Sequence, residues 1–180
     1  ARTWETIDEA NATTNNISRV MIARDNTNVI YAVGESDTII KSENGGKTWF
    51  VPVAAPTGTA GNITALWVVN QSTVIVGTSV GEVFETTDGG ATAWTEQTEI
   101  PGLTTKANTT INDITGCGCD VLFMVVSDAT GDVYKFYRNV DGGADGRWFE
   151  PDDYETIPAS HGLEAVACCG PNHAIAVGGE

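Results

Sequence analysis

Paired carboxylates come nearest to a catalytic set in this chain. Hydrolysis of a glycosidic bond requires two carboxyl groups at a suitable separation, one of which acts as the acid. Asp113, Asp120 and Glu164 lie in or beside short apolar segments that could bring them together. The chain has 24 acidic residues, however, so some carboxylates fall at such positions by chance. Solvated surface side chains are the favoured interpretation, and Asp113 and Glu164 stay weak acidic candidates.

No other residues form a recognisable catalytic constellation. The two histidines, His161 and His173, lie in loop-like contexts. No serine or cysteine occupies a nucleophile-elbow motif, and "GCGC" and "CCGP" lack the partners that activate a thiol. We therefore predict no catalytic residue, no cofactor and no enzymatic activity within this chain.

The four cysteines form two close sets, Cys117 with Cys119 and Cys168 with Cys169. Zinc sites usually use wider spacings such as C-x₂-C, and vicinal cysteines are poor tetrahedral partners. Buried free thiols and one or two disulfides both stay open as interpretations. We predict no metal site.

The charge balance excludes several classes of partner. The net charge is −15, and such a surface would repel nucleic acid and anionic lipid. No apolar stretch reaches the length of a membrane span, so we expect no membrane insertion. Five N-x-S/T triplets are compatible with a secreted glycoprotein; they begin at Asn11, Asn16, Asn62, Asn70 and Asn108.

Tryptophans recur at similar intervals along the chain, and a glycine-rich cluster precedes three of them. These clusters read "SENGGKTW", "TTDGGATAW" and "NVDGGADGRW", and the opening "ARTW" resembles the end of another copy. The repeated positions are Ser42, Asn44, Gly45, Gly46, Thr48 and Trp49; Thr86, Asp88, Gly89, Gly90 and Trp94; Asn139, Asp141, Gly142, Gly143 and Trp148; and Trp4.

The segments between these clusters repeat as well. Each unit has a short apolar strand, a second strand ending near glycine, a third alternating strand, and then the turn with a strand opening at tryptophan. Runs of Val, Ile, Thr and aromatic residues between Gly, Asn and Asp favour β-structure. Four strands in a repeat of about 40–50 residues are the signature of a β-propeller blade. The sequence therefore predicts an all-β fold, a β-propeller.

The chemistry of the Asn/Asp-Gly-Gly cluster is that of a tight hairpin. Glycine permits the positive φ angles of such a turn. The Asn or Asp side chain can accept hydrogen bonds from turn amides, and a preceding Ser or Thr can join this network. The tryptophan can bury its ring and donate its N–H to a carbonyl. Each of these roles is structural.

These copies resemble the Asp-box, or BNR, repeat S/T-x-D-x-G-x-T-W. The repeat occurs in sialidases and other glycoside hydrolases, in sortilin-type receptors and in a photosystem II assembly factor. The match is nearly complete at Ser42–Trp49, where Asn44 takes the Asp position. The resemblance implies a propeller whose boxes lie on the outer rim, away from the axial face where ligands bind.

The resemblance also provides a test for sialidase activity, which requires three arginines around the substrate carboxylate. Outside the rim positions this chain has only Arg19 and Arg24, so a sialidase site is not expected. The photosystem assembly factor resembles the chain in the residue pattern of its repeats, but its function is associated with a basic surface. The net charge of −15 argues against that role here.

Counted from tryptophan to tryptophan, the blades span about 4–47, 48–93, 94–147 and 148–180, within a single domain 1–180. The last unit is incomplete. We expect an arc or part of a larger propeller, although closure of the chain on itself is the alternative. Cys117 and Cys169 occupy equivalent positions on the first strands of adjacent units, which makes a disulfide between blades a candidate.

The favoured function is a non-catalytic binding or structural module. Its setting would be a virion surface, a cell surface or a secreted, extracellular protein. Expected partners are other protein subunits or blades at the open flank, and also glycans. The alternatives are a fragment of a glycoside hydrolase and an assembly factor of the photosystem type.

Overall fold

The computed structural model describes residues 13–52, 56, 61–98, 100, 103, 109–117, 121–128, 135–139, 148–149, 162–171 and 173–179. Every regular element in these ranges is a β-strand, so the all-β prediction is confirmed. None of the described residues belongs to a helix that could cross a membrane.

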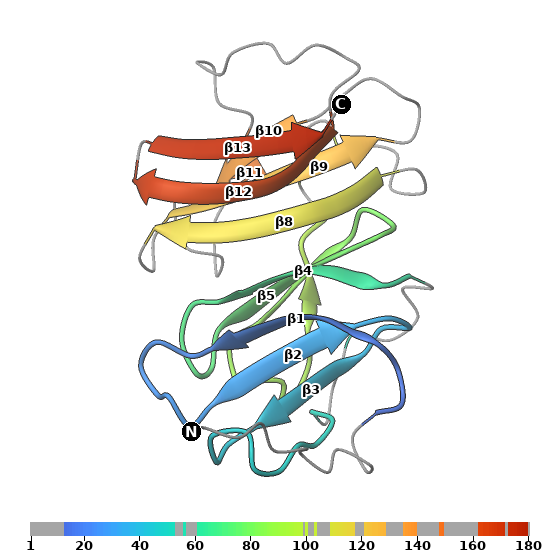
Figure 1. Ribbon diagram of the computed structural model, residues 1–180, viewed down its shortest axis with the longest axis vertical. Coiled ribbons are helices and arrows are strands. Elements are labelled where there is room, and N and C mark those ends of the chain that lie inside the picture. The colour runs from blue at the N-terminus through green and yellow to red at the C-terminus, as the bar shows by residue number, and fades with distance from the viewer. Residues whose placement is uncertain are drawn as a thin grey trace, which may run out of the picture.

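Antiparallel pairing joins the strands into four sheets, each made of strands consecutive in sequence (Figure 1). The first sheet contains β1 (Ile17–Ile22), β2 (Ile30–Gly34) and β3 (Ile39–Ser42). The second contains β4 (Ile63–Val68), β5 (Val74–Thr78), β6 (Val83–Thr86) and β7 (Thr95–Glu96). The third contains β8 (Thr109–Cys117), β9 (Val121–Asp128), β10 (Lys135–Asn139) and β11 (Trp148–Phe149). The fourth contains β12 (Gly162–Gly170) and β13 (His173–Gly179).

The strands at Trp94 and Trp148 belong to the preceding sheet. β7 begins directly after Trp94 and pairs with β6, and β11 begins at Trp148 and pairs with β10. The predicted unit boundaries at 93/94 and 147/148 therefore fall inside a sheet. The physical reason is that the glycine-rich turn closes a local hairpin, so both of its strands lie in one sheet.

The apolar core lies between consecutive sheets. One buried cluster joins the first and second sheets, another joins the second and third, and another joins the third and fourth. The first strands β1, β4, β8 and β12 contact one another in this order. In Figure 1 the first sheet lies at the bottom and the fourth at the top. We call the face of a sheet that looks toward the next one its leading face, and the opposite face its trailing face.

Close approach of the second and third sheets depends on glycines, and Gly116 is one of them. The Trp67 side chain on β4 is 6% exposed and packs against the backbone of Gly116 on β8. A Cβ atom at Gly116 would lie 2.5 Å from the indole nitrogen, a distance that real Cβ contacts do not reach. The guanidinium of Arg24 lies 4.9 Å from the centre of the Trp67 ring.

Candidate functional site

The turn after β3 is held by its own side chains. Ser42 Oγ accepts the Gly46 N–H at 2.9 Å and donates to Asn44 Oδ1 at 3.0 Å. Asn44 Oδ1 also accepts the Thr48 N–H at 2.9 Å, while its Nδ2 donates to Thr48 Oγ1 at 2.8 Å. The polar groups of this turn are therefore occupied by one another and fix the hairpin.

The turn after β6 repeats this arrangement with a carboxylate. Thr86 Oγ1 accepts the Gly90 N–H at 3.0 Å and donates to Asp88 Oδ1 at 2.9 Å. Asp88 Oδ2 accepts both the backbone N–H and the hydroxyl of Thr92. Hydrogen bonds from Thr92 and Thr86 lower the pKa of Asp88 to about 2, because they favour its charged form.

Four glycines supply the left-handed backbone of these two turns. Their φ angles are 73° and 86° at Gly45 and Gly46, and 71° and 81° at Gly89 and Gly90. A side chain at these positions would be strained, which explains why both turns carry Gly-Gly.

The two tryptophans that close these turns differ in hydrogen bonding. Trp49 Nε1 donates to the Gly46 carbonyl at 3.1 Å. Trp94 Nε1 is buried and has no partner among the described residues. The second turn has one extra residue before its tryptophan, and this insertion shifts the indole along the chain.

The third turn lies mostly outside the described residues. Asn139 ends β10, and Trp148 begins β11 with its side chain only 2% exposed. Asp141, Gly142, Gly143 and Trp4 lie outside the described ranges.

A disulfide joins the third and fourth sheets, but not through the predicted pair. Cys117 bonds to Cys168 with a Cα–Cα distance of 5.6 Å, and Cys169 is a free, exposed thiol. The prediction of a Cys117–Cys169 bond was wrong because equivalent residues of two blades point in the same direction around the fold. The Cys117 side chain lies on the leading face of the third sheet. The residue that faces it on the fourth sheet is Cys168, which directly precedes Cys169, the equivalent of Cys117 in the repeat.

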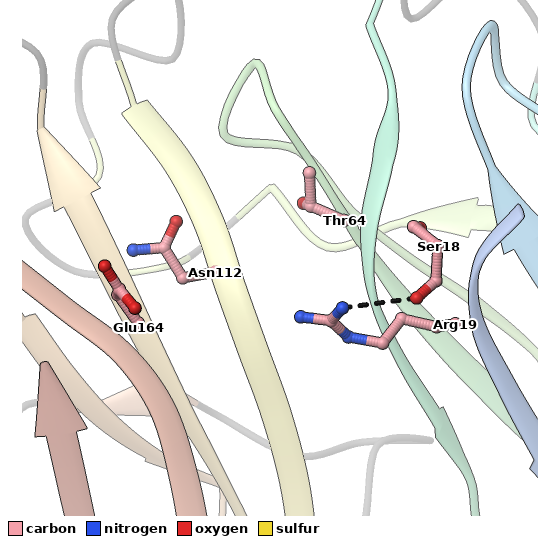
Figure 2. Close-up of a pocket in the computed structure, with 5 residues that line it drawn as sticks. All are labelled: Ser18, Arg19, Thr64, Asn112 and Glu164. Carbon is pink, nitrogen blue, oxygen red and sulfur yellow. Dashed lines mark hydrogen bonds between the residues drawn. The ribbon is translucent and has the colours of Figure 1, made fainter. Parts of the chain in front are cut away.

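A shallow cleft of about 250 Å³ lies where the first strands of the four sheets come together (Figure 2). Its lining residues are Ser18, Arg19, Thr64, Asn112 and Glu164. Figure 2 shows the Arg19 side chain extending from β1 toward β8, and its Nη1 donates to the Ser18 carbonyl at 3.2 Å. Glu164 lies on the opposite side, on β12, and is exposed.

The two acidic candidates have different surroundings. Asp113 Oδ2 accepts the backbone N–H of Val166 at 2.9 Å, so this carboxylate joins the third sheet to the fourth. Glu164 lines the cleft. The structure therefore does not bring Asp113 and Glu164 together as two cleft carboxylates. Within the described residues no group of three or more His, Cys, Asp or Glu side chains could hold a metal ion.

Comparison with known proteins identifies the fold. No family model and no curated protein matches the chain. Among solved structures, a GH74 xyloglucanase from Xanthomonas campestris superposes with a TM-score of 0.64 at 20% identity, over 91% of this chain and 27% of that one. YCF48 bound to D1 peptide superposes with a TM-score of 0.57 at 18% identity, over 77% and 40%. YCF48 from Cyanidioschyzon merolae gives 0.59 at 14% identity, over 88% and 48%.

These structures are β-propeller proteins. The fold is a β-propeller. The chain spans less than half the length of each of these proteins. At these identities the similarity establishes the fold and leaves activity open.

The propeller fold explains how the cleft residues are aligned. Each first strand contains a β-bulge, at which one residue has no direct partner on the second strand. These bulge residues are Ser18, Thr64, Asn112 and Glu164. All four line the cleft, because a bulge re-aims its side chain away from the regular alternation.

The first three bulge residues also tie each sheet to the next. The bonds run from Ser18 Oγ to the Ile63 carbonyl at 3.0 Å, from Thr64 Oγ1 to the Ile111 carbonyl at 2.5 Å, and from Asn112 Nδ2 to the Leu163 carbonyl at 2.6 Å. Glu164 has a carboxylate at this position and, when ionised, has no proton to donate. This column of residues was not predicted from the sequence, although each bulge residue is the polar residue directly after an Ile or Leu that opens the repeat.

We predict that Asp88→Asn leaves the fold intact and removes part of its acid sensitivity. The folded-state pKa of Asp88, about 2, lies below its ordinary value of 3.8. Its stabilising contribution is therefore complete above about pH 4 and is lost as the pH falls toward 2. Asn44 shows that a carboxamide can occupy the same position in the first turn.

Thermal unfolding of wild type and Asp88→Asn between pH 5 and pH 2, followed by circular dichroism, would measure this difference. The melting temperature of the variant should fall less steeply below about pH 4. Asp88→Ala is the comparison that removes the turn hydrogen bonds at every pH. Parallel pH profiles for wild type and Asp88→Asn would contradict the prediction.

Proposed function

We propose that this chain is a non-catalytic β-propeller module of the Asp-box type, which acts by binding a protein or a glycan at its axial cleft. The observation that carries the proposal is that the Asp113 carboxylate joins the third sheet to the fourth. This carboxylate is hydrogen-bonded to the Val166 backbone and does not line the cleft, whereas a hydrolase of the two-carboxylate type needs two acids that flank the bond to be cleaved. Glu164 is then the one carboxylate among the cleft-lining residues of the described chain.

The assignment to the Asp-box type is supported by the two described turns. Both use a Ser or Thr hydroxyl at the strand end, an Asn or Asp two residues later, and two glycines with positive φ. In both turns the polar side chains are hydrogen-bonded within the turn itself. This supports a structural role for the boxes and a binding role for the axial cleft.

The chemistry of the cleft suits a polar, hydrogen-bonding ligand. Arg19 offers guanidinium donors, Asn112 offers a carboxamide, and Glu164 offers a carboxylate. A peptide backbone or the hydroxyls of a glycan would pair with this set. A YCF48 structure was solved bound to D1 peptide, which supports peptide binding on this type of fold. The surplus of acidic residues supports an exposed setting, at an extracellular, cell or virion surface.

The glycoside hydrolase alternative is supported by the similarity to the GH74 xyloglucanase and by the exposed Glu164 in the cleft. Under this alternative, the chain would release reducing sugar and the activity would be lost in Glu164→Gln. An assembly role like that of the photosystem factor is a further alternative, supported by the two YCF48 structures.

We predict that Arg19→Ala weakens ligand binding at the cleft about tenfold or more, because a hydrogen bond to a charged group contributes about 1.5–3 kcal/mol. Glycan and peptide arrays would first identify a ligand, and its dissociation constant would then be measured by calorimetry. Arg24→Ala is the matched control, because Arg24 lies over the Trp67 ring and does not line the cleft.

Equal loss of affinity in Arg19→Ala and Arg24→Ala would contradict binding at the cleft. Release of reducing sugar from a bound glycan, abolished by Glu164→Gln, would overturn the non-catalytic assignment. Binding without turnover would support it.

A further inference from the structure

The two hydroxyl groups in the cleft have no proton left for a ligand. Ser18 Oγ donates to the Ile63 carbonyl at 3.0 Å, and Thr64 Oγ1 donates to the Ile111 carbonyl at 2.5 Å. A hydroxyl has one proton and two lone pairs, so both oxygens can still accept a hydrogen bond. This part of the cleft therefore suits a ligand that brings N–H or O–H groups.

The neighbouring strands add further acceptors. Asn112 Nδ2 gives one of its two N–H groups to the Leu163 carbonyl at 2.6 Å, and its Oδ1 accepts the Ser127 hydroxyl at 3.4 Å with one lone pair remaining. The ionised carboxylate of Glu164 only accepts. Among the described residues this carboxylate has no hydrogen-bond or ion-pair partner. Acceptors therefore outnumber donors in all parts of the cleft except around Arg19.

The cleft has a basic side and an acidic side. Figure 2 shows Asn112 between the guanidinium of Arg19 and the carboxylate of Glu164. Apart from its bond to the Ser18 carbonyl, the Arg19 guanidinium has no partner among the described residues, so most of its N–H groups are available. The carboxylate of Asp113, bonded to a backbone N–H of β12, adds negative charge to the acidic side.

The dimensions of the cleft favour side chains of a large partner over a free small molecule. Its volume is about 250 Å³ and it is shallow. Small-molecule sites usually occupy about 300–1,000 Å³ and enclose most of the ligand surface. The net charge of −15 would also attract a partner that carries basic groups and would speed their encounter.

We propose that the cleft binds a segment of another protein that presents a basic side chain to Glu164 and an acidic side chain to Arg19. The inference rests on the binding function proposed above and specifies the class of ligand. A lysine ammonium has three donors and no acceptor, which matches the acceptors at Glu164 and Asn112. A carboxylate matches the guanidinium donors of Arg19. A neutral glycan would leave both charges without a counterpart.

Four mixtures of short synthetic peptides test this ligand class. Each mixture has random Gly, Ala, Ser and Tyr residues and two fixed residues at varied separation: Asp with Lys, Asp with Gln, Asn with Lys, or Asn with Gln. Fluorescence polarisation of labelled peptides would measure their affinities. The wild type should bind the Asp/Lys mixture about two- to fivefold more tightly than either singly charged mixture, the effect expected of an exposed ion pair.

Variants of the two charged residues separate the two contacts. Glu164→Gln should abolish the preference for Lys over Gln and keep the preference for Asp over Asn. Arg19→Gln should do the reverse, a pattern that loss of folding would not produce. Glu43→Gln is the matched control for net charge. Glu43 is 59% exposed, pairs with Lys41 in the turn after β3 and does not line the cleft, so this variant should keep both preferences.

The outcomes distinguish this inference from the binding function on which it rests. Equal binding of the four mixtures would overturn the ligand class, and so would a preference for Lys that persists in Glu164→Gln, since it would reflect general attraction to an acidic surface. Binding of a neutral glycan that Arg19→Gln weakens would support the cleft as the binding site and overturn the inference. If no peptide or glycan responded to either variant, both proposals would be wrong.

Discussion

Replacing Trp148 by alanine should lower the free energy of unfolding by about 3–5 kcal/mol, the cost of removing a large buried aromatic side chain. Trp148 is 2% exposed and lies in the core cluster between the second and third sheets. Removal of the indole would leave a cavity beside Met124 and Leu122, which are both fully buried. In a chain of this size, the loss corresponds to a fall in melting temperature of roughly 6–20 °C.

Trp49→Ala is the matched comparison. Trp49 occupies the equivalent position after the first turn, but it is only half-buried and its main polar contact is with the Gly46 carbonyl. The loss should therefore be smaller, about 1–2 kcal/mol. Urea unfolding followed by tryptophan fluorescence and circular dichroism would give both values. Equal losses for the two variants would contradict a special role of Trp148 in the core.

Replacing Cys117 by serine should lower the free energy of unfolding by about 2–4 kcal/mol, since the disulfide restricts the unfolded chain. The bond joins residues 51 apart in sequence and connects the third and fourth sheets. Reduction of the wild type by dithiothreitol should have a similar effect. Chemical denaturation with and without reductant would measure it.

Cys169→Ser separates this prediction from a general effect of cysteine replacement. Cys169 is exposed and free, so the variant should unfold like the wild type and should keep its sensitivity to reductant. If Cys169→Ser removed that sensitivity while Cys117→Ser did not, the pairing described here would be wrong.

The fold could be predicted because the repeat is local. Glycine pairs with required φ angles, such as Gly45 and Gly46, and the alternating strands around them carry their signal in a few adjacent residues. The strands predicted near Leu163–Cys169 and His173–Gly179 correspond to β12 and β13.

The contacts between sheets were harder to predict. Alignment of the repeats placed Cys117 and Cys169 in one column, but residues in one column point the same way and so cannot face each other. The role of Asp113 was missed for a related reason. Its partner is a backbone N–H of the next sheet. Nearly every residue has such a group, so the residue types in the sequence do not indicate this partner. The bulge residues needed the register between strands, which only the structure provides.

The pairing of strands that are neighbours in sequence has a consequence for folding. Each sheet can close its own hairpins before it meets another sheet, so most of the chain entropy is lost over short loops. Stability should then behave as a sum over sheets and their nearest neighbours, as in repeat proteins. Amide hydrogen exchange should be slowest in β4, β5, β8 and β9, whose sheets are covered on both faces, and faster in β1 and β13.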